Sequence, residues 1–231
     1  MRPRSHPHLL AAALVAIALA VAGCGSSSSS SSGSSSSSSA ASSSTPATTS
    51  TGSASSTTPG FEGVALEQGD QLAPAGTTQT GTVDGIQCGA SEQLVYHIHA
   101  HLFVFVNGAP RAIPAGIGIP GSSTQLTPQG PIAAGGRCIY WLHTHTSDGV
   151  MHIESPTQRV YTLGNFFDVW HQPLSATQVA AAHGKVTGYV NGKPWAKDPR
   201  SIALTPHAVI QLSVGTPVVP FQSLSWAGTQ L

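Results

Sequence analysis

The chain has 231 residues and carries 9 Lys and Arg against 9 Asp and Glu, so its formal net charge is +0 with neutral histidines. This balance leaves no basic excess for binding a polyanion, and we expect no nucleic-acid partner. The 11 histidines are the main anomaly of the composition, because nine of them lie after residue 90.

The first 23 residues have the features of a signal peptide. Arg2 and Arg4 give a positive start, and residues 9–22 form an apolar run without charge. The run is shorter than the roughly 20 apolar residues that a transmembrane helix needs. Residues 21–24 (VAGC) resemble the lipobox of bacterial lipoproteins, which implies cleavage before Cys24 and a lipid on its thiol. An ordinary secretory signal is the alternative, and both interpretations predict export.

A low-complexity segment follows the predicted cleavage site. Residues 26–59 are almost entirely Ser, Thr, Ala and Gly, and they cannot bury enough apolar surface to offset the entropy of ordering. We therefore predict a signal peptide at 1–23, a lipidated cysteine and disordered tether at 24–60, and one folded domain at 61–231. Without its two N-terminal arginines, the mature chain has a net charge of about −2.

The predicted location is outside the cytoplasm, with the lipid as the anchor to the cell membrane. Such compartments favour disulfide bonds, and the two cysteines that remain form an even pair. We expect Cys88 and Cys138 to be bridged. The alternative is that one of them is a thiolate ligand of a metal ion.

Short β-type runs separated by turn residues dominate the domain. The longest covers residues 93–106, and others cover 138–145 and 150–154. Asn-Gly dipeptides at 107–108 and 191–192 predict two-residue hairpin turns.

Two short helices are predicted between the strands. One covers residues 163–170 after the capping residue Thr162, and the other covers 176–183 after Ser175. Together the pattern predicts an all-β fold, a β-sandwich or a small barrel, with one or two short helices. A cupredoxin-like sandwich is one such fold that fits the length.

The first candidate metal-binding segment lies in the longest predicted strand. Because side chains alternate between faces, His97, His99 and His101 share one face and precede the aromatic Phe103, while the opposite face is apolar core. His97 and His101 would lie about 13 Å apart along the strand. A neighbouring pair, rather than all three histidines, is therefore expected to bind one ion.

The second segment contains three further histidines and a carboxylate. If residues 148–149 (DG) formed a two-residue turn, His145 would face His152, and His143 would face Glu154. All four polar side chains would then lie on one face of a hairpin. Three imidazoles and a carboxylate are typical donors for a first-row transition metal.

A disulfide between the cysteines would hold the two histidine segments close together, which favours one shared metal site or two adjacent ones. The expected ligands are one pair from the first strand together with His143 and His145, while His152 and Glu154 are further ligands or orient the imidazoles. The alternative is a hydrogen-bonded or pH-sensitive polar cluster. The complete candidate set is His97, His99, His101, His143, His145, His152 and Glu154.

These motifs resemble an uncharacterised family of exported bacterial and archaeal proteins. The resemblance rests on residues 97–108, a His-x-His-x-His-Leu strand ending in Val-Asn-Gly, on 142–156, and on 163–170, and it spans roughly residues 88–215. It implies no activity. A shorter resemblance, Trp-Leu-His-Thr-His at 141–145, is to multicopper oxidases. The chain lacks their later His-Cys-His region and the length of several cupredoxin domains, which argues against a trinuclear oxidase.

The sequence thus predicts a histidine site for copper or zinc, with copper slightly favoured because imidazoles are abundant and the chain is exported. A Cys88–Cys138 bond would exclude a blue-copper centre, which needs a free thiolate. The expected function is a membrane-anchored protein for metal capture, sensing or delivery. The alternative is a mononuclear metalloenzyme, a hydrolase or an oxidoreductase, at the cell surface. The sequence identifies no catalytic residue and no protein partner.

Overall fold

The structure is a computed structural model, and it describes residues 58–76 and 78–231. The predicted signal peptide, the predicted lipid site Cys24 and most of the predicted tether lie outside these residues. Within the described part of the chain, no helix has both the length and the apolarity required to cross a membrane.

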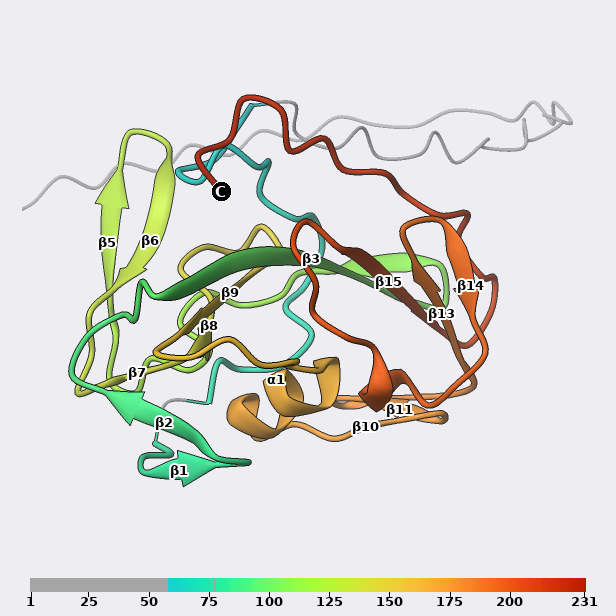
Figure 1. Cartoon of the computed structure of the whole chain (residues 1–231). Helices are drawn as coiled ribbons and strands as arrows, with labels where there is room; N and C mark the ends of the chain where they lie inside the picture. The colour runs from blue at the N-terminus through green and yellow to red at the C-terminus, as the bar shows by residue number, and fades with distance from the viewer. Residues whose placement is uncertain (1–57, 77) are drawn as a thin grey trace, which may run out of the picture. The chain divides into compact units, whose positions relative to one another are not determined.

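Strands dominate the described residues, which confirms the predicted all-β class (Figure 1). The largest sheet has seven strands in the order β14-β13-β15-β3-β9-β8, with β4 paired to β3. Its strands are β3 (Tyr96–Val106), β4 (Ala109–Arg111), β8 (Leu142–His143), β9 (Val150–Ser155), β13 (Val186–Val190), β14 (Lys193–Trp195) and β15 (Val209–Val214).

Three smaller sheets surround the large one. The first contains β1 (Thr82–Val83), β2 (Ile86–Gly89) and β7 (Ile139–Tyr140), the second β5 (Ser123–Thr127) and β6 (Gly130–Ala134), and the third β10 (Leu174–Ser175), β11 (Gln178–Val179) and β12 (Ala182–His183). The helical elements are α1 (Leu163–Trp170) and the 3₁₀ turn η1 (Pro199–Ser201).

Strand β3 lies at the centre of the large sheet and separates its two faces. It runs parallel to β15 and antiparallel to β9. Ala100, Leu102 and Val104 are buried in the main hydrophobic core, as the alternation of the sequence predicts. Helix α1 packs on this face with Phe166 and Trp170. The histidines of β3 alternate with these core residues and therefore point to the other face.

Helix α1 begins and ends where the sequence predicts. The Thr162 side chain accepts the Asn165 backbone N–H, and the Asn165 side chain accepts the Thr162 backbone N–H, which together form a capping box. The predicted second helix at 176–183 is wrong, because this segment forms β11 and β12. Tertiary contacts override helix propensity here: Val179 and Ala180 are buried, and the Ala180 N–H donates to the Pro173 carbonyl.

Both Asn-Gly dipeptides form the predicted hairpin turns. They connect β3 to β4 and β13 to β14, with Val106 opposite Ala109 and Val190 opposite Lys193. Both residues of each turn have positive φ, 50° and 80° in the first and 49° and 78° in the second. This conformation suits the right-handed twist of the flanking strands, and Asn and Gly adopt it readily.

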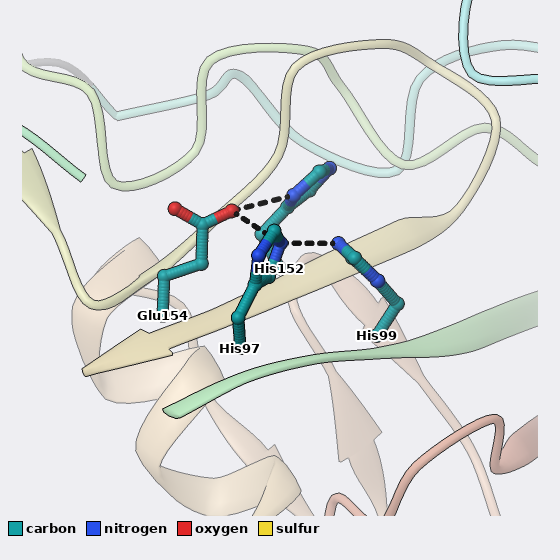
Figure 2. Close-up of side chains that lie close together, drawn as sticks. All are labelled: His97, His99, His152 and Glu154. Atoms are coloured by element: carbon teal, nitrogen blue, oxygen red, sulfur yellow. Dashed lines mark hydrogen bonds and ion pairs between the residues drawn. The ribbon is translucent and has the colours of Figure 1, made fainter. Parts of the chain in front are cut away.

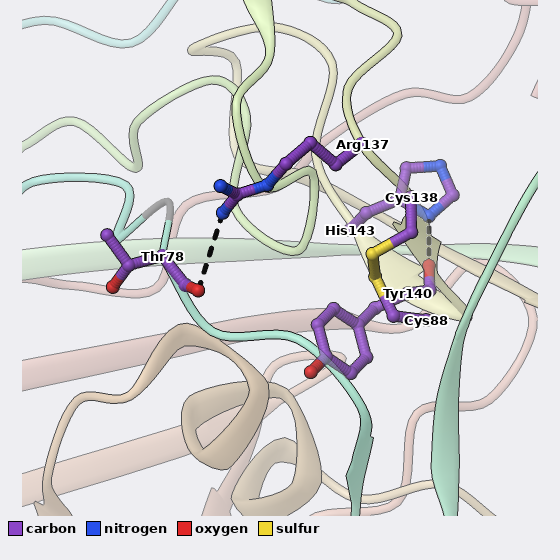
Figure 3. Close-up of a disulfide and its surroundings, with 6 residues drawn as sticks. All are labelled: Thr78, Cys88, Arg137, Cys138, Tyr140 and His143. Carbon is purple, nitrogen blue, oxygen red and sulfur yellow. Dashed lines mark hydrogen bonds between the residues drawn. A yellow bond between two sulfur atoms is a disulfide. The ribbon is translucent and has the colours of Figure 1, made fainter.

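The predicted disulfide is also confirmed. Cys88 and Cys138 are bonded, with Cα atoms 5.3 Å apart (Figure 3). Cys88 lies in β2 opposite Tyr140 of β7, so the bond fastens β2 to the chain that leads directly into β8. Both cysteines of the described part of the chain are therefore unavailable as thiolate ligands.

The segments at both ends of the described domain contact the histidine face of the large sheet. In the N-terminal segment, the Glu67 N–H donates to the Ser147 carbonyl. In the C-terminal segment, the Gln222 N–H donates to the Gln211 side chain of β15, and the Trp226 indole donates to the His207 carbonyl. Figure 1 shows the C-terminal segment, in red, on the side of β3 opposite α1.

Candidate metal centre

A row of three histidines crosses the large sheet. His99 of β3 lies opposite His152 of β9, and His152 lies opposite His143 of β8. His97 lies opposite Glu154 in the next pair of this ladder on the same face. Because opposed side chains share a face of the sheet, strand pairing alone brings these groups together.

The predicted hairpin register around residues 148–149 is wrong. His143, rather than His145, lies opposite His152, because the connection between β8 and β9 covers residues 144–149 instead of two residues. These residues bond to other parts of the chain: the Gly116 N–H donates to the Thr144 carbonyl, and the Ala133 N–H donates to the His145 carbonyl. Those tertiary hydrogen bonds are stronger constraints than the local turn signal.

The outer side of β8 is covered by residues 114–119. The Thr144 hydroxyl donates to the Pro114 carbonyl and accepts the Ile117 N–H. A Cβ atom at Gly118 would lie 2.3 Å from the Leu142 carbonyl oxygen, so only glycine permits this close approach. As a result, His143 is fully buried although β8 is the last strand of the sheet.

The first group of donors combines β3 and β9. It contains His97, His99, His152 and Glu154, whose donor atoms all lie within 4.8 Å of one another (Figure 2). The His97 and His99 Nε2 atoms are 3.0 Å apart, and the Glu154 Oε1 atom is 3.1 Å from both His97 Nε2 and His152 Nδ1. Two ligands on one tetrahedral zinc ion would be roughly 3.3 Å apart, which is close to these separations.

The second group contains His143, His145 and His152. The Nε2 atoms of His143 and His145 are 3.1 Å apart. Their Nδ1 atoms face backbone carbonyls, those of Tyr140 at 2.8 Å and Ala133 at 2.9 Å (Figure 3 for His143). A carbonyl only accepts, so each Nδ1 carries a proton, and in the neutral form of either ring Nε2 presents a lone pair.

Glu62 is a site residue that no pattern in the sequence marks. Its Oε1 atom is 3.1 Å from His152 Nε2, and its Oε2 atom accepts the Thr146 hydroxyl. Burial opposes protonation of His152, but hydrogen bonds to Glu154 and Glu62 outweigh burial and raise the pKa of His152 to about 9. This imidazole therefore lies between two carboxylates and carries a proton near neutral pH.

The neighbouring imidazoles respond in the opposite direction. Burial lowers the pKa of His99 to about 3, and the nearby His152 adds to this effect. Burial also holds the pKa of His143 well below its ordinary value. Both rings are consequently neutral at pH 7, which is the form that binds a metal ion.

A second overlooked carboxylate belongs to Glu92, just before β3. Its Oε1 atom is 3.1 Å from His145 Nε2, and it forms a donor group with His143 and Glu154. The side chain is 41% exposed, so it lies at the outer edge of the cluster. Both Glu62 and Glu92 reach the site from loops, where no strand period marks a functional residue.

His101 does not belong to any of these donor groups. It is buried further along β3, and its Nε2 donates to the Asp148 carbonyl at 2.6 Å. Burial lowers the pKa of His101 to about 4, raises that of Asp148 to about 7, and raises that of Glu67 well above its ordinary value. The structure thus groups His97 with His99, as expected for neighbours, and places His101 in a separate buried polar cluster.

The cluster is accessible from the β3 side. His97 and His99 line a cavity of about 270 Å³ together with Pro206, His207 and Leu231. His97 is the most exposed of the clustered imidazoles, at 38%, whereas His143 is completely buried. An ion or a small ligand would therefore approach past His97.

The fold and the site define an all-β protein whose buried histidine and glutamate groups could hold a metal ion. Comparison of the chain with protein-family models, with curated proteins and with solved structures gives no match. The resemblances to an exported family and to multicopper oxidases therefore stay predictions from the sequence.

Proposed function

We propose that the protein binds a transition-metal ion, copper or zinc, for capture, sensing or delivery outside the cytoplasm. The observation that carries this proposal is the contact between His143 and His145. Two imidazoles whose Nδ1 atoms are held as donors direct their Nε2 atoms at each other across 3.1 Å, and the Glu92 carboxylate is 3.1 Å from His145 Nε2. Two ring nitrogens at this distance repel unless a cation or a proton lies between them.

The surroundings favour a metal ion as that cation. Backbone carbonyls that hold Nδ1–H of a histidine fix its tautomer and aim Nε2, as they do around protein-bound metals. The same patch offers further imidazoles and the Glu154 carboxylate at metal-ligand spacing. A site with several imidazoles and a carboxylate suits both copper and zinc. With both cysteines in a disulfide, a blue-copper type of centre is not part of the proposal.

The proposed location rests on the sequence before the described domain. A signal peptide with a lipobox-like end at Cys24 and a long Ser-rich segment would hold the domain at a membrane surface. The disulfide is compatible with an oxidising compartment. Labelling of cells with a lipid precursor, with and without Cys24→Ala, tests this part independently of metal binding.

The test of metal binding uses the purified full-length chain, stripped with a chelator and then titrated with Cu(II) or Zn(II). We expect bound metal by elemental analysis and a higher melting temperature, and we expect a large loss of both in a His143→Ala/His145→Ala variant. His183→Ala is the matched control, because His183 is an exposed histidine of β12 away from the donor groups. A wild-type chain that gains neither metal nor stability would overturn the proposal.

The cavity beside His97 and His99 favours a second candidate, a metalloenzyme with an open coordination position. At about 270 Å³ the cavity would admit water or a small ligand. Addition of azide to the copper-loaded chain separates the two functions. A changed visible spectrum would indicate an exchangeable position and support catalysis, whereas an unchanged spectrum would indicate a closed site and support binding alone.

A further inference from the structure

The two His-x-His pairs fall into different donor groups. His97 and His99 belong to the group that contains Glu154, and His143 and His145 belong to the other. Strands β3 and β8 lie on either side of β9. Among the described residues, no group of donor atoms within 4.8 Å of one another contains members of both pairs. Each pair is therefore placed to bind its own ion.

His152 is the one residue common to both histidine groups. It occupies the middle of the cross-strand row, its ring is stacked at 5.1 Å on His143, and its ring centroid is 4.6 Å from that of His99. Both ring nitrogens already have anionic partners, Nδ1 with Glu154 and Nε2 with Glu62. One cation at each nitrogen would displace the two ring protons to solvent, as metal binding at imidazoles releases protons.

We infer that the cluster binds two transition-metal ions in adjacent positions, with His152 between them. This inference rests on the proposed metal-binding function and adds a second ion to it. His97, His99 and Glu154 would bind the first ion, and His143 and His145 would bind the second. The arrangement gives each ion one His-x-His pair and a share of the central imidazole.

The cavity gives the two positions different properties. The first ion lies beside the opening lined by His97 and His99, and it exchanges with solvent more readily. The second ion lies beside His143, which is fully buried, and is retained more strongly. A partial treatment with chelator is therefore expected to remove one ion before the other.

Native mass spectrometry of the full-length chain, titrated separately with Zn(II) and Cu(II), counts the ions directly. We expect two ions per chain in the wild type and one in either His97→Ala or His145→Ala. Both changes affect partly exposed side chains, 38% and 14% exposed, and should leave the fold intact. His183→Ala should still bind two ions, and a chain without all five clustered histidines should bind none.

The outcomes separate this inference from the proposed function. If the wild-type chain bound a single ion and either variant lost it, the inference of a second ion would be overturned. The proposed metal-binding function would still stand. A wild-type chain without metal would overturn both. Retention of two ions by the chain lacking the five histidines would overturn the assignment of the donors.

Electron paramagnetic resonance of the copper-loaded chain tests the position of His152. Two Cu(II) ions joined by one imidazole couple magnetically, so the integrated signal at low temperature should be well below the copper content. His152→Ala should give an uncoupled signal or lose both ions. An integrated signal equal to the copper content in the wild type would overturn the shared imidazole.

Discussion

His143 and His145 direct their Nε2 atoms at each other across 3.1 Å, while their Nδ1 atoms donate to the carbonyls of Tyr140 and Ala133. The two carbonyls belong to different parts of the chain, the end of β7 and the end of β6. The orientation of the imidazoles is therefore built into the backbone of two sheets, and metal binding would require little rearrangement at this pair.

The first prediction concerns the tautomers of this pair. In the zinc-loaded chain, ¹⁵N chemical shifts of labelled histidine should identify protonated Nδ1 and metal-bound Nε2 for both His143 and His145. The reason is that a backbone carbonyl can only accept a hydrogen bond. Metal coordination through Nδ1 of either ring would contradict the hydrogen bonds described here.

The second prediction concerns Glu62. Replacing it with Gln removes the charge that holds His152 Nε2, so Glu62→Gln should weaken metal affinity by about 10- to 100-fold. Asp70→Asn is the matched control, because Asp70 is exposed and belongs to none of the donor groups. Competition with a coloured chelator measures both affinities. Equal affinities of Glu62→Gln and the wild type would show that Glu62 does not contribute to metal binding.

The third prediction concerns the pH dependence of folding and Asp148. Burial raises the pKa of this carboxyl to about 7, and the Glu62 charge adds to the effect. A group with a raised folded-state pKa binds its proton more tightly when folded, so its stabilising contribution is lost as pH rises from about 4 to 7. Each pKa unit corresponds to about 1.4 kcal/mol.

Asp148→Asn should therefore flatten this part of the pH profile. Urea unfolding of the chelator-treated chain, at several values between pH 4 and pH 8, measures it. The unfolding free energy of the variant, relative to that of the wild type, should increase as pH rises. Parallel profiles would show that Asp148 does not titrate in this interval.

The fourth prediction concerns the Cys88–Cys138 bond, which closes a loop with a sequence separation of 50 residues. Loop entropy gives a stabilisation of roughly 4 kcal/mol for a loop of this size. A Cys88→Ala/Cys138→Ala variant should lose about that much unfolding free energy in urea. Addition of a reductant should lower the wild type to a similar value and should not affect the variant.

The fifth prediction concerns the two faces of β9. Ile153 is completely buried in the hydrophobic core, between His152 and Glu154 in sequence but on the opposite face. Ile153→Ala should cost about 2–5 kcal/mol of unfolding free energy. His97→Ala, by contrast, should change the metal-free stability little, because the side chain is 38% exposed. A destabilisation by His97→Ala as large as that by Ile153→Ala would contradict this division.

Features that depend on residues close together in the chain could be predicted from the sequence alone. The period of two along β3 separates His97 and His99 from the core residues Ile98 and Ala100, and the same period separates His152 from Ile153. The Asn-Gly turns and the cap of α1 are equally local, because they depend on φ preferences and on a side chain reaching three residues along the chain.

The assembly of these strands and turns into a site depends on contacts between segments that are distant in sequence. The pairing of His143 with His152, against the predicted register, depends on hydrogen bonds that join residues 114–117 and 133 with the loop after β8. The contact between Glu62 and His152 joins residues 90 positions apart in sequence, and the hydrogen bond from His101 to the Asp148 carbonyl joins residues 47 positions apart. No local pattern encodes such contacts, because they arise from the packing of distant segments against one sheet.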